Sequence, residues 1–182
     1  TSKEPSFNAD TKTYTITNGE ELAWVSDVTN GVITSGKNFP SDITFSGYTI
    51  ELTENIHLND ASDWEGWEEN GPRNKWSPIG YDNMFSGRFD GNNHCIRGLY
   101  CKKDLYAGLF AKADGEILNV ILDNTVIIAD SDNYINSIAG SIVSEGKGVS
   151  ISNCYNLNNV IVKGNKNVVG GICGQLEKGS IH

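Results

Sequence analysis

The chain has 182 residues, 38 % of them hydrophobic, and its 14 Lys and Arg against 23 Asp and Glu give a formal charge of −9. This charge repels phosphate backbones and anionic lipid surfaces, which excludes nucleic acid as an expected partner. No uninterrupted apolar run approaches the ~20 residues that span a bilayer, and no charged-then-apolar leader opens the chain. We therefore expect no integral membrane segment, and either a cytosolic protein or a trimmed secreted piece.

The composition favours strands over helices. The chain has 20 Gly and one Met, together with many Thr, Ser, Asn and Ile. Gly, Thr, Ser, Asn and Ile are frequent in strands and turns and are weaker helix formers than Met, of which the chain has one. A length of 182 residues suits one domain, which we place over residues 13–182.

The N-terminal part predicts a linker and then a cap. Residues 1–12 are polar and are interpreted as a linker or the edge of the domain, and residues 13–17 alternate as a strand does. Thr17 and Glu20 form a capping-box pattern for a helix that Asn30-Gly31 would end. Its apolar residues recur at helical spacing, at Leu22, Val25 and Val28. We expect this cap, over 13–31, to cover the open edge of the first strands.

Two short strands and a long loop come next. Residues 48–53 and 55–58 alternate apolar and polar side chains and predict the first full rung, a rung being one circuit of strand segments. Residues 59–75 then show no strand periodicity and hold five acidic residues and two Trp. We expect this acidic and aromatic stretch to form a protruding loop.

The stretch from Phe85 to Leu99 predicts a strand, a corner and a second strand. Asp90-Gly91-Asn92-Asn93 is a tight-turn cluster, and Gly87 and Gly98 interrupt the apolar residues around it. Those apolar residues stand at strand-like spacing, at Phe85, Phe89, Ile96 and Leu99.

Later segments repeat related patterns. The pattern Tyr106-Ala-Gly-Leu-Phe-Ala aligns with the segment that starts at Ala139, 33 residues on, and with the one that starts at Val169, a further 30 residues on. Ile117-Leu-Asn119 aligns with Ile151-Ser-Asn153, and Val126-Ile-Ile with Val160-Ile-Val, both at an offset of 34. A corner loop four residues shorter after Val162 than after Ile128 accounts for the change from 34 to 30.

Parallel stacking keeps each apolar position of such a repeat above its counterpart. We therefore expect an all-β protein, a right-handed parallel β-helix (β-solenoid) with an N-terminal capping α-helix and rungs about 4.8 Å apart. Leu109, Ile142 and Ile172 should form an inward ladder, and Asn119 should lie over Asn153. Residues 179–182 match the start of another strand, so the chain is expected to continue past 182.

Several segments resemble bacterial surface proteins with GLUG-motif repeats. They are Trp76-Ser-Pro-Ile-Gly80, Phe85-x-Gly-x-Phe-Asp-Gly-Asn, Ile96-x-Gly-Leu99, Ala107-Gly-Leu-Phe110 and Ile151-Ser-Asn-Cys154. The Thr17–Val28 helix and the segment Leu52–Leu58 are similar to the lead-in of that family. Three residues depart from the family pattern. Asn93 stands where the family usually has Gly, and Ala111 and Ser144 stand where it has a closing Gly. The resemblance covers nearly the whole chain, with GLUG-like rungs over 106–182.

The resemblance implies a β-helical, exported protein of gut or oral bacteria, secreted or at the cell surface. Members of this family include adhesins and the non-catalytic regions of proteins labelled immunoglobulin A1 proteases. Such a module would be part of a larger surface protein. The family supplies no agreed catalytic residues.

The cysteines and histidines do not predict a metal site. None of the four cysteines forms a CxxC pair, and the three histidines do not cluster with them. Cys154 and Cys173 lie in or after apolar strand patterns, so we expect free thiols in the core, and Cys95 with Cys101 is the one disulfide candidate close in sequence. No cofactor is expected.

The sequence holds no protease signature, neither His-Glu-x-x-His nor Gly-x-Ser-x-Gly. A carbohydrate-active β-helix, of the polysaccharide lyase or glycoside hydrolase kind, would instead use residues such as Asp82, Asp90, Arg88 and Arg97. The alternative role of Asp90 is to accept backbone N–H bonds at the corner, and the two arginines would then be solvated.

The acidic and aromatic loop is the best candidate for ligand binding. Trp64 and Trp67 could stack on sugar rings, with Asp63, Glu68 and Glu69, beside Asp60 and Glu65, accepting hydroxyl hydrogen bonds or holding calcium. The alternative is that both Trp rings fold onto the domain as a flap. Trp76 is expected in the core.

We expect a non-catalytic module that binds a glycan or a host surface protein in adhesion. The alternatives are the carbohydrate-active enzyme and a purely structural spacer.

Overall fold

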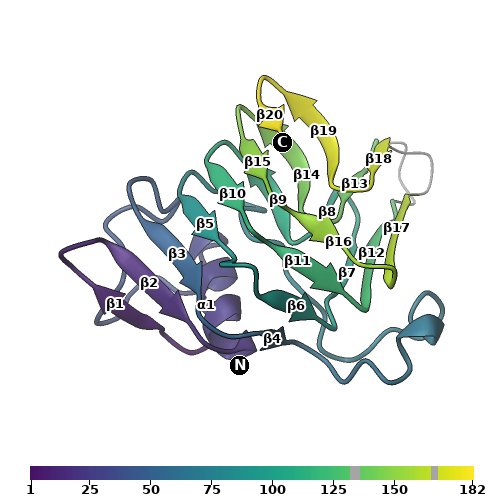
Figure 1. Cartoon of the computed structure of the whole chain (residues 1–182), viewed down its shortest axis with the longest axis horizontal. Coiled ribbons are helices and arrows are strands. Elements are labelled where there is room, and N and C mark those ends of the chain that lie inside the picture. Colours follow the sequence, from purple (N-terminus) through teal and green to yellow (C-terminus); the bar gives the residue numbers. More distant parts are fainter. Residues whose placement is uncertain (132–135, 165–167) are drawn as a thin grey trace.

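The computed structural model describes residues 1–131, 136–164 and 168–182. Within these ranges the chain is dominated by short strands in parallel sheets, with one α-helix, α1 (Gly19–Thr29), and one short 3-10 helix, η1 (Trp64–Gly66) (Figure 1). The expectation of a strand-rich protein is confirmed.

The central part of the chain passes three times through the same five sheets in the same order. The first passage comprises β5 (Arg88–Asp90), β6 (Cys95–Arg97), β7 (Tyr100–Lys103), β8 (Tyr106–Ala107) and β9 (Phe110–Ala113). The second comprises β10 (Glu116–Leu118), β11 (Ile121–Asp123), β12 (Thr125–Ala129), β13 (Ile138–Gly140) and β14 (Val143–Lys147). The third comprises β15 (Ser150–Ser152), β16 (Tyr155–Asn156), β17 (Val160–Gly164), β18 (Val168–Gly170) and β19 (Cys173–Glu177), before β20 (Ser180–Ile181). All pairs between these passages are parallel.

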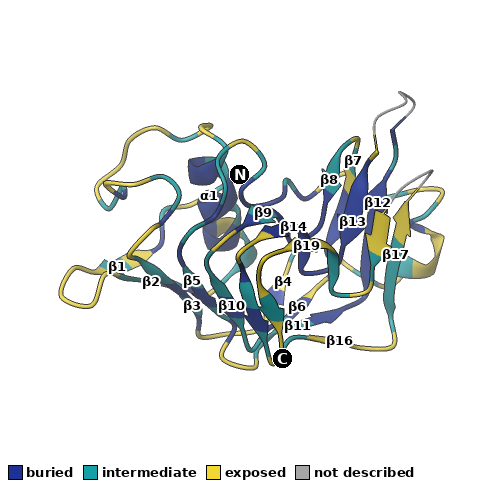
Figure 2. Ribbon diagram, turned by 90° about the horizontal axis from the view of Figure 1, so that it is seen from above, coloured by how far each residue is buried: buried dark blue, intermediate teal, exposed yellow. Residues whose placement is uncertain are grey.

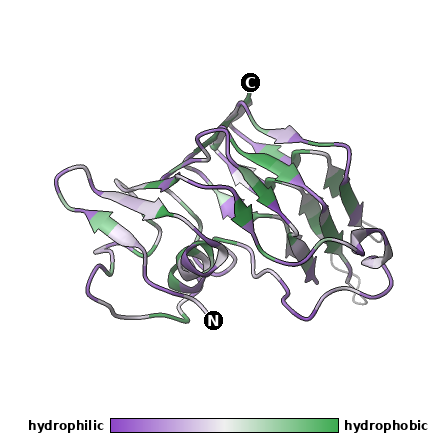
Figure 3. Ribbon diagram, turned by 60° about the horizontal axis from the view of Figure 1, so that its bottom comes forward, coloured by the Kyte–Doolittle hydropathy of each residue, from purple (hydrophilic) through white to green (hydrophobic). Residues whose placement is uncertain are grey.

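The core lies between the sheets, where apolar residues of the first two passages are buried at matching register positions. Ile117 of β10 pairs with Phe89 of β5 on one side and with Ile151 of β15 on the other, and all three are buried. Leu109 and Ile142 are fully buried, and Ile172 packs against the same core, so the predicted ladder is confirmed. Figure 3 shows hydrophobic colour concentrated on the strands and hydrophilic colour on the connections.

An amide ladder runs along one corner. The Asn153 Nδ2 donates to the Asn119 Oδ1 at 3.3 Å, and the Asn119 Nδ2 donates to the Asp90 Oδ1 at 2.9 Å. Asn119 and Asn153 have φ of 56° and 52°, the left-handed region that Asn tolerates better than most residues. The predicted stacking of Asn119 and Asn153 is therefore confirmed, and it includes the Asp90 carboxylate.

Two predicted registers are wrong by one residue. Val126 of β12 pairs with Ile161 of β17 instead of Val160, and Ala139 of β13 pairs with Ala107 of β8 instead of Tyr106. In both cases one extra residue in a connection shifts the strand, while the neighbouring sheet keeps its register. The corner loops of different length lie partly outside the described residues.

The N-terminal part covers one end of the sheets. β2 (Thr13–Ile16) and β3 (Thr49–Leu52) extend the sheet of β5, while β4 (Ile56–His57) extends that of β6. Residues 1–12 are not merely a linker, because β1 (Ser6–Asn8) pairs antiparallel with β2 and covers its edge. The C-terminal end of α1 bonds to the segment before β5, where the Ser26 Oγ donates to the Ser77 carbonyl at 2.6 Å.

The helix begins one residue later than predicted. Its N-cap is Asn18, whose Oδ1 accepts from the Glu21 N–H at 3.0 Å, and the Thr17 N–H and hydroxyl both donate to the Glu21 carboxylate at 2.8 Å. Burial alone would raise the pKa of Glu21, but these bonds and the Lys3 ammonium together lower it. The predicted stop is correct, since Asn30 is the C-cap and Gly31 has a φ of 68°.

The third passage is more exposed than the second. All five residues of β12 are buried, whereas β17, which pairs with it, is intermediate or exposed throughout (Figure 2). Apolar side chains 39–48 % exposed follow in β18 to β20, namely Val168, Val169, Leu176 and Ile181. Within the described ranges, no helix is long and apolar enough to cross a bilayer.

Candidate functional site

The acidic and aromatic loop of residues 59–75 has a fixed base. The Asn59 Nδ2 donates to the Asn74 carbonyl at 3.0 Å and to the Gly98 carbonyl at 2.9 Å. In return, the Asn74 Nδ2 donates to the Leu58 carbonyl at 2.8 Å. The loop therefore leaves β4 and returns through a closed set of hydrogen bonds, so its base keeps one position against the strands.

Trp67 anchors the loop to the outer face of the β7-β12-β17 sheet. Its ring is 1 % exposed and lies edge-on to Tyr100, with centroids 6.1 Å apart, in a cluster with Val126 and Ile128. The indole Nε1 donates to the Asp63 carboxylate at 2.9 Å. A ring buried in this way cannot stack on a sugar, so for Trp67 the flap interpretation is correct and the ligand-binding prediction is wrong.

The three acidic residues predicted to bind a ligand together with Trp64 and Trp67 lie in different surroundings. Asp63 accepts the Trp67 N–H and lines a small cavity of about 360 Å³. Glu68 forms an ion pair with Lys163 of β17, which ties the loop to the third passage. Glu69 is exposed and lines none of the cavities described below. These three carboxylates do not converge on one site.

Trp64 is the ligand-binding candidate that lines a larger cavity. Trp24, Trp67 and Trp76 are 2 %, 1 % and 6 % exposed, whereas Trp64 is only half-buried, on η1. The cavity beside it measures about 680 Å³. We call it the Trp64 lobe; it is lined by His57, Leu58, Asn59, Asp60, Ala61, Ser62, Trp64, Arg97 and Asn124.

Polar groups of the Trp64 lobe come from successive strands. His57 of β4 pairs in register with Arg97 of β6, and Arg97 with Asp123 of β11. Arg97 donates its Nε and Nη2 to one Asp123 oxygen, at 3.0 and 2.7 Å, which holds the guanidinium in place. Asn124 is 7 % exposed, and its amide makes no hydrogen bond to the described part of the chain. An aromatic face thus lies beside a free amide and a fixed cation.

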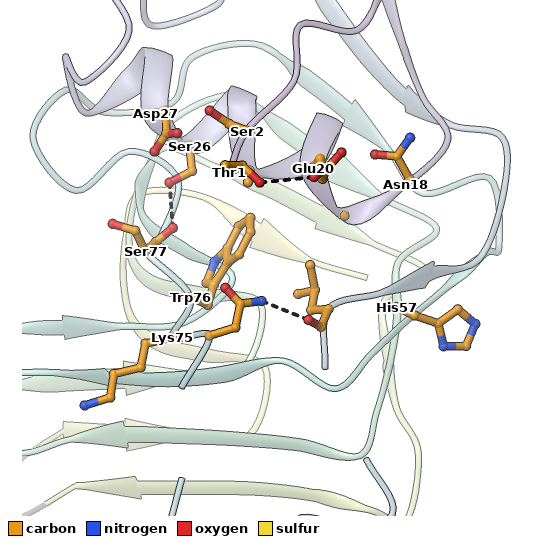
Figure 4. A pocket seen from close by; sticks show the side chains of 14 residues that line it. Thr1, Ser2, Asn18, Glu20, Ser26, Asp27, His57, Lys75, Trp76 and Ser77 are labelled. Atoms are coloured by element: carbon orange, nitrogen blue, oxygen red, sulfur yellow. Dashed lines mark hydrogen bonds between the residues drawn. The ribbon is translucent and has the colours of Figure 1, made fainter. Parts of the chain in front are cut away.

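A second cavity adjoins the first at His57 and Leu58. It measures about 650 Å³ and lies between α1 and the segment that follows the loop (Figure 4). We call it the helix lobe; its floor includes Ala23, Leu58 and Trp76. Figure 4 shows the Trp76 ring at its centre, directed toward α1, with Glu20 and Asp27 on the helix side and Lys75 and His57 pointing outward. Trp76 is 6 % exposed, as expected for a core residue.

The candidate catalytic carboxylates do not form a pair. Asp90 accepts hydrogen bonds from Arg88 at 3.1 Å, from the Asn92 N–H at 2.9 Å and from the Asn119 amide at 2.9 Å, so its oxygens serve the corner. Arg88 also pairs with Glu116 at 2.7 Å. Asp82 is exposed on the segment bonded to the end of α1. The structural interpretation of Asp90 is therefore correct, but Arg88 and Arg97 are ion-paired and not simply solvated.

All four cysteines are free thiols, so the Cys95–Cys101 disulfide candidate is not formed. Cys101 is fully buried, and burial raises the pKa of its thiol to about 12. Cys154 and Cys173 pack against the core. For residues 1–131, 136–164 and 168–182, no three His, Cys, Asp or Glu side chains are placed to hold a metal ion.

Sequence reasoning did not identify His57 or Asn124 as site residues. His57 lies in a short edge strand, and Asn124 lies in a connection with φ of 43°. Their proximity depends on the parallel register of β4, β6 and β11, which no local signal shows. No protein-family model, curated protein or solved structure matches this chain.

Proposed function

We propose that this chain is a non-catalytic, glycan-binding module of an exported bacterial surface protein, with the Trp64 lobe as its binding site. The parallel sheets are interpreted as a right-handed parallel β-helix, since three passages through the same five sheets are what successive rungs of such a fold produce. The location at the surface of a bacterium rests on the GLUG-like motifs.

The observation that carries the proposal is the half-buried Trp64 ring beside the unpartnered Asn124 amide. A sugar presents an apolar face of C–H groups and a rim of hydroxyls, which an indole ring and an amide complement respectively. The Asp60 carboxylate and the His57 imidazole line the same lobe and are exposed. Each can bond a hydroxyl without breaking a contact described above.

The charge of the chain favours a neutral glycan. Its formal charge is −9, and Asp60 faces the lobe while the charge of Arg97 is balanced by Asp123. An acidic sugar would meet this negative field. Neutral mucin-type and plant-type oligosaccharides are therefore the expected ligands, and a host protein would be recognised through the glycans it carries.

Binding is tested by isothermal calorimetry against four neutral oligosaccharide series, of chito-, cello-, xylo- and N-acetyllactosamine type. We expect at least one series to bind, and Trp64→Ala to lower its affinity about tenfold or more, the loss typical of an aromatic contact of one to two kcal/mol. Glu69→Ala, a change in the same loop outside both lobes, is the matched control and should bind as the wild type does.

Two outcomes would overturn the proposal. If none of the series binds, the spacer role is favoured. If the wild type releases reducing ends from any of them, the carbohydrate-active alternative replaces the non-catalytic one.

A further inference from the structure

Two cavities meet at the end of β4, and together they exceed what one small ligand requires. The Trp64 lobe and the helix lobe measure about 680 and 650 Å³ and share His57 and Leu58 in their linings. A single drug-sized ligand occupies a pocket of about 300–1,000 Å³. Each lobe is therefore large enough for a ligand unit of its own.

The helix lobe has the same kind of lining as the Trp64 lobe. Its apolar lining is Ala23, Leu58 and the 6 % of Trp76 that is exposed, and its polar lining includes Glu20 and Lys75, both exposed. The Trp76 Nε1 donates to the Leu109 carbonyl at 3.0 Å, so this ring is held by the core and cannot turn away. The floor is thus preformed, which lowers the cost of ordering on binding.

Both lobes are fixed relative to one another. The bonds that join Asn59, Asn74 and Leu58 lie where the loop leaves the strands, and Asn59 lines one lobe while Asn74 lines the other. His57 is exposed at the junction, so a chain that crosses from lobe to lobe would pass over its imidazole. A rigid arrangement of two sites favours a ligand whose units are linked at a fixed spacing.

We propose that the two adjoining lobes together bind one extended neutral oligosaccharide, with one part of the sugar chain on Trp64 and another part in the helix lobe. The inference rests on the proposed function and adds a second subsite and a requirement for chain length. Short sugars occupy the Trp64 lobe alone. Longer sugars gain the contacts of the helix lobe without the further loss of translational and rotational entropy that binding a second, separate ligand would require.

The test is the dependence of affinity on chain length, measured with the same four oligosaccharide series from one to six units. We expect the wild type to bind the longest members about tenfold or more tightly than the disaccharides, the gain that a few added hydrogen bonds give. Ala23→Trp, which fills the helix lobe, should remove this gain and leave disaccharide affinity unchanged. Glu20→Ala combined with Lys75→Ala strips the rim without touching the core, so it serves if the larger side chain disturbs folding.

Glu54→Ala, an exposed change outside both lobes, should keep the wild-type dependence on length. If the disaccharides and the hexasaccharides bind equally, or if the helix-lobe variants keep the gain, the second subsite is wrong while the glycan-binding function stands. If the wild type binds no member of any series, both are wrong.

Discussion

Replacing Trp67 with Ala tests whether the loop of residues 59–75 is part of the folded structure. The ring is 1 % exposed, and a Trp side chain buries about 150–250 Å². At about 25 cal/mol per Å² this corresponds to an upper limit of roughly 4–6 kcal/mol. Removing a buried Trp costs about 3–5 kcal/mol in protein cores, so we expect a loss in that range in the free energy of unfolding.

The assay is urea denaturation followed by far-ultraviolet circular dichroism, which does not depend on the indole that the variant lacks. Trp64→Ala is the matched control on the same loop, and it should lose less than about 2 kcal/mol because its ring is only half-buried. A midpoint for Trp67→Ala close to that of the wild type would refute the reasoning. Proteolytic cleavage confined to residues 59–75 would then show that the loop detaches on its own.

Three further predictions concern the corner and the cap. Asn119→Ala should destabilise by about 1–2 kcal/mol more than Asn119→Gly in the same urea assay, because φ is 56° and only Gly adopts it freely; equal losses would contradict this. Gly91→Ala would place a Cβ against the Asn119 carbonyl oxygen and should lower the free energy of unfolding by more than about 2 kcal/mol. Gly66→Ala, whose Cβ would have no atom within 4 Å, is the control and should stay within about 0.5 kcal/mol of the wild type. Similar melting temperatures for the two variants would argue against the close approach at Gly91. The pKa of Glu21 is lower in the folded state, so its contribution to the free energy of unfolding is present above the unfolded value of about 4.5 and is lost as pH falls through the folded value. Glu21→Gln should therefore reduce the slope of the unfolding free energy against pH on the acid side. An unchanged slope would count against this prediction.

The repeats of the fold were predictable where an apolar residue or an asparagine returns at a fixed spacing. Ile117 and Ile151 lie at the predicted register, and so do Asn119 and Asn153. The register of Val126 was not predictable, because β-branched residues fill β12 and β17 on both sides of the pairing and a shift by one leaves the pattern almost unchanged. Sequence alone therefore indicates that strands stack, more reliably than it indicates which residues pair.

The candidate site was predictable only in part. A Trp in an acidic loop indicates either a ligand contact or an anchor, and burial alone distinguishes Trp64 from Trp67. Asn18 is the N-cap instead of Thr17; both residue types are preferred N-caps, with Asn somewhat better, so the local sequence did not decide between them. His57, Arg97 and Asn124 become neighbours through parallel pairing between distant segments, which no local pattern contains.

The most direct test of glycan binding is a tryptophan-fluorescence titration of the protein with mucin and with neutral plant polysaccharides, in which the same samples are assayed for released reducing ends. Trp24 and Trp67 line neither lobe, and Trp76 is only 6 % exposed, so protection from quenching by iodide, a solute that reaches exposed rings, reports mainly on Trp64. The account predicts a saturable change, absent in Trp64→Ala, with no reducing ends released. A flat titration, or binding accompanied by released ends, would contradict it.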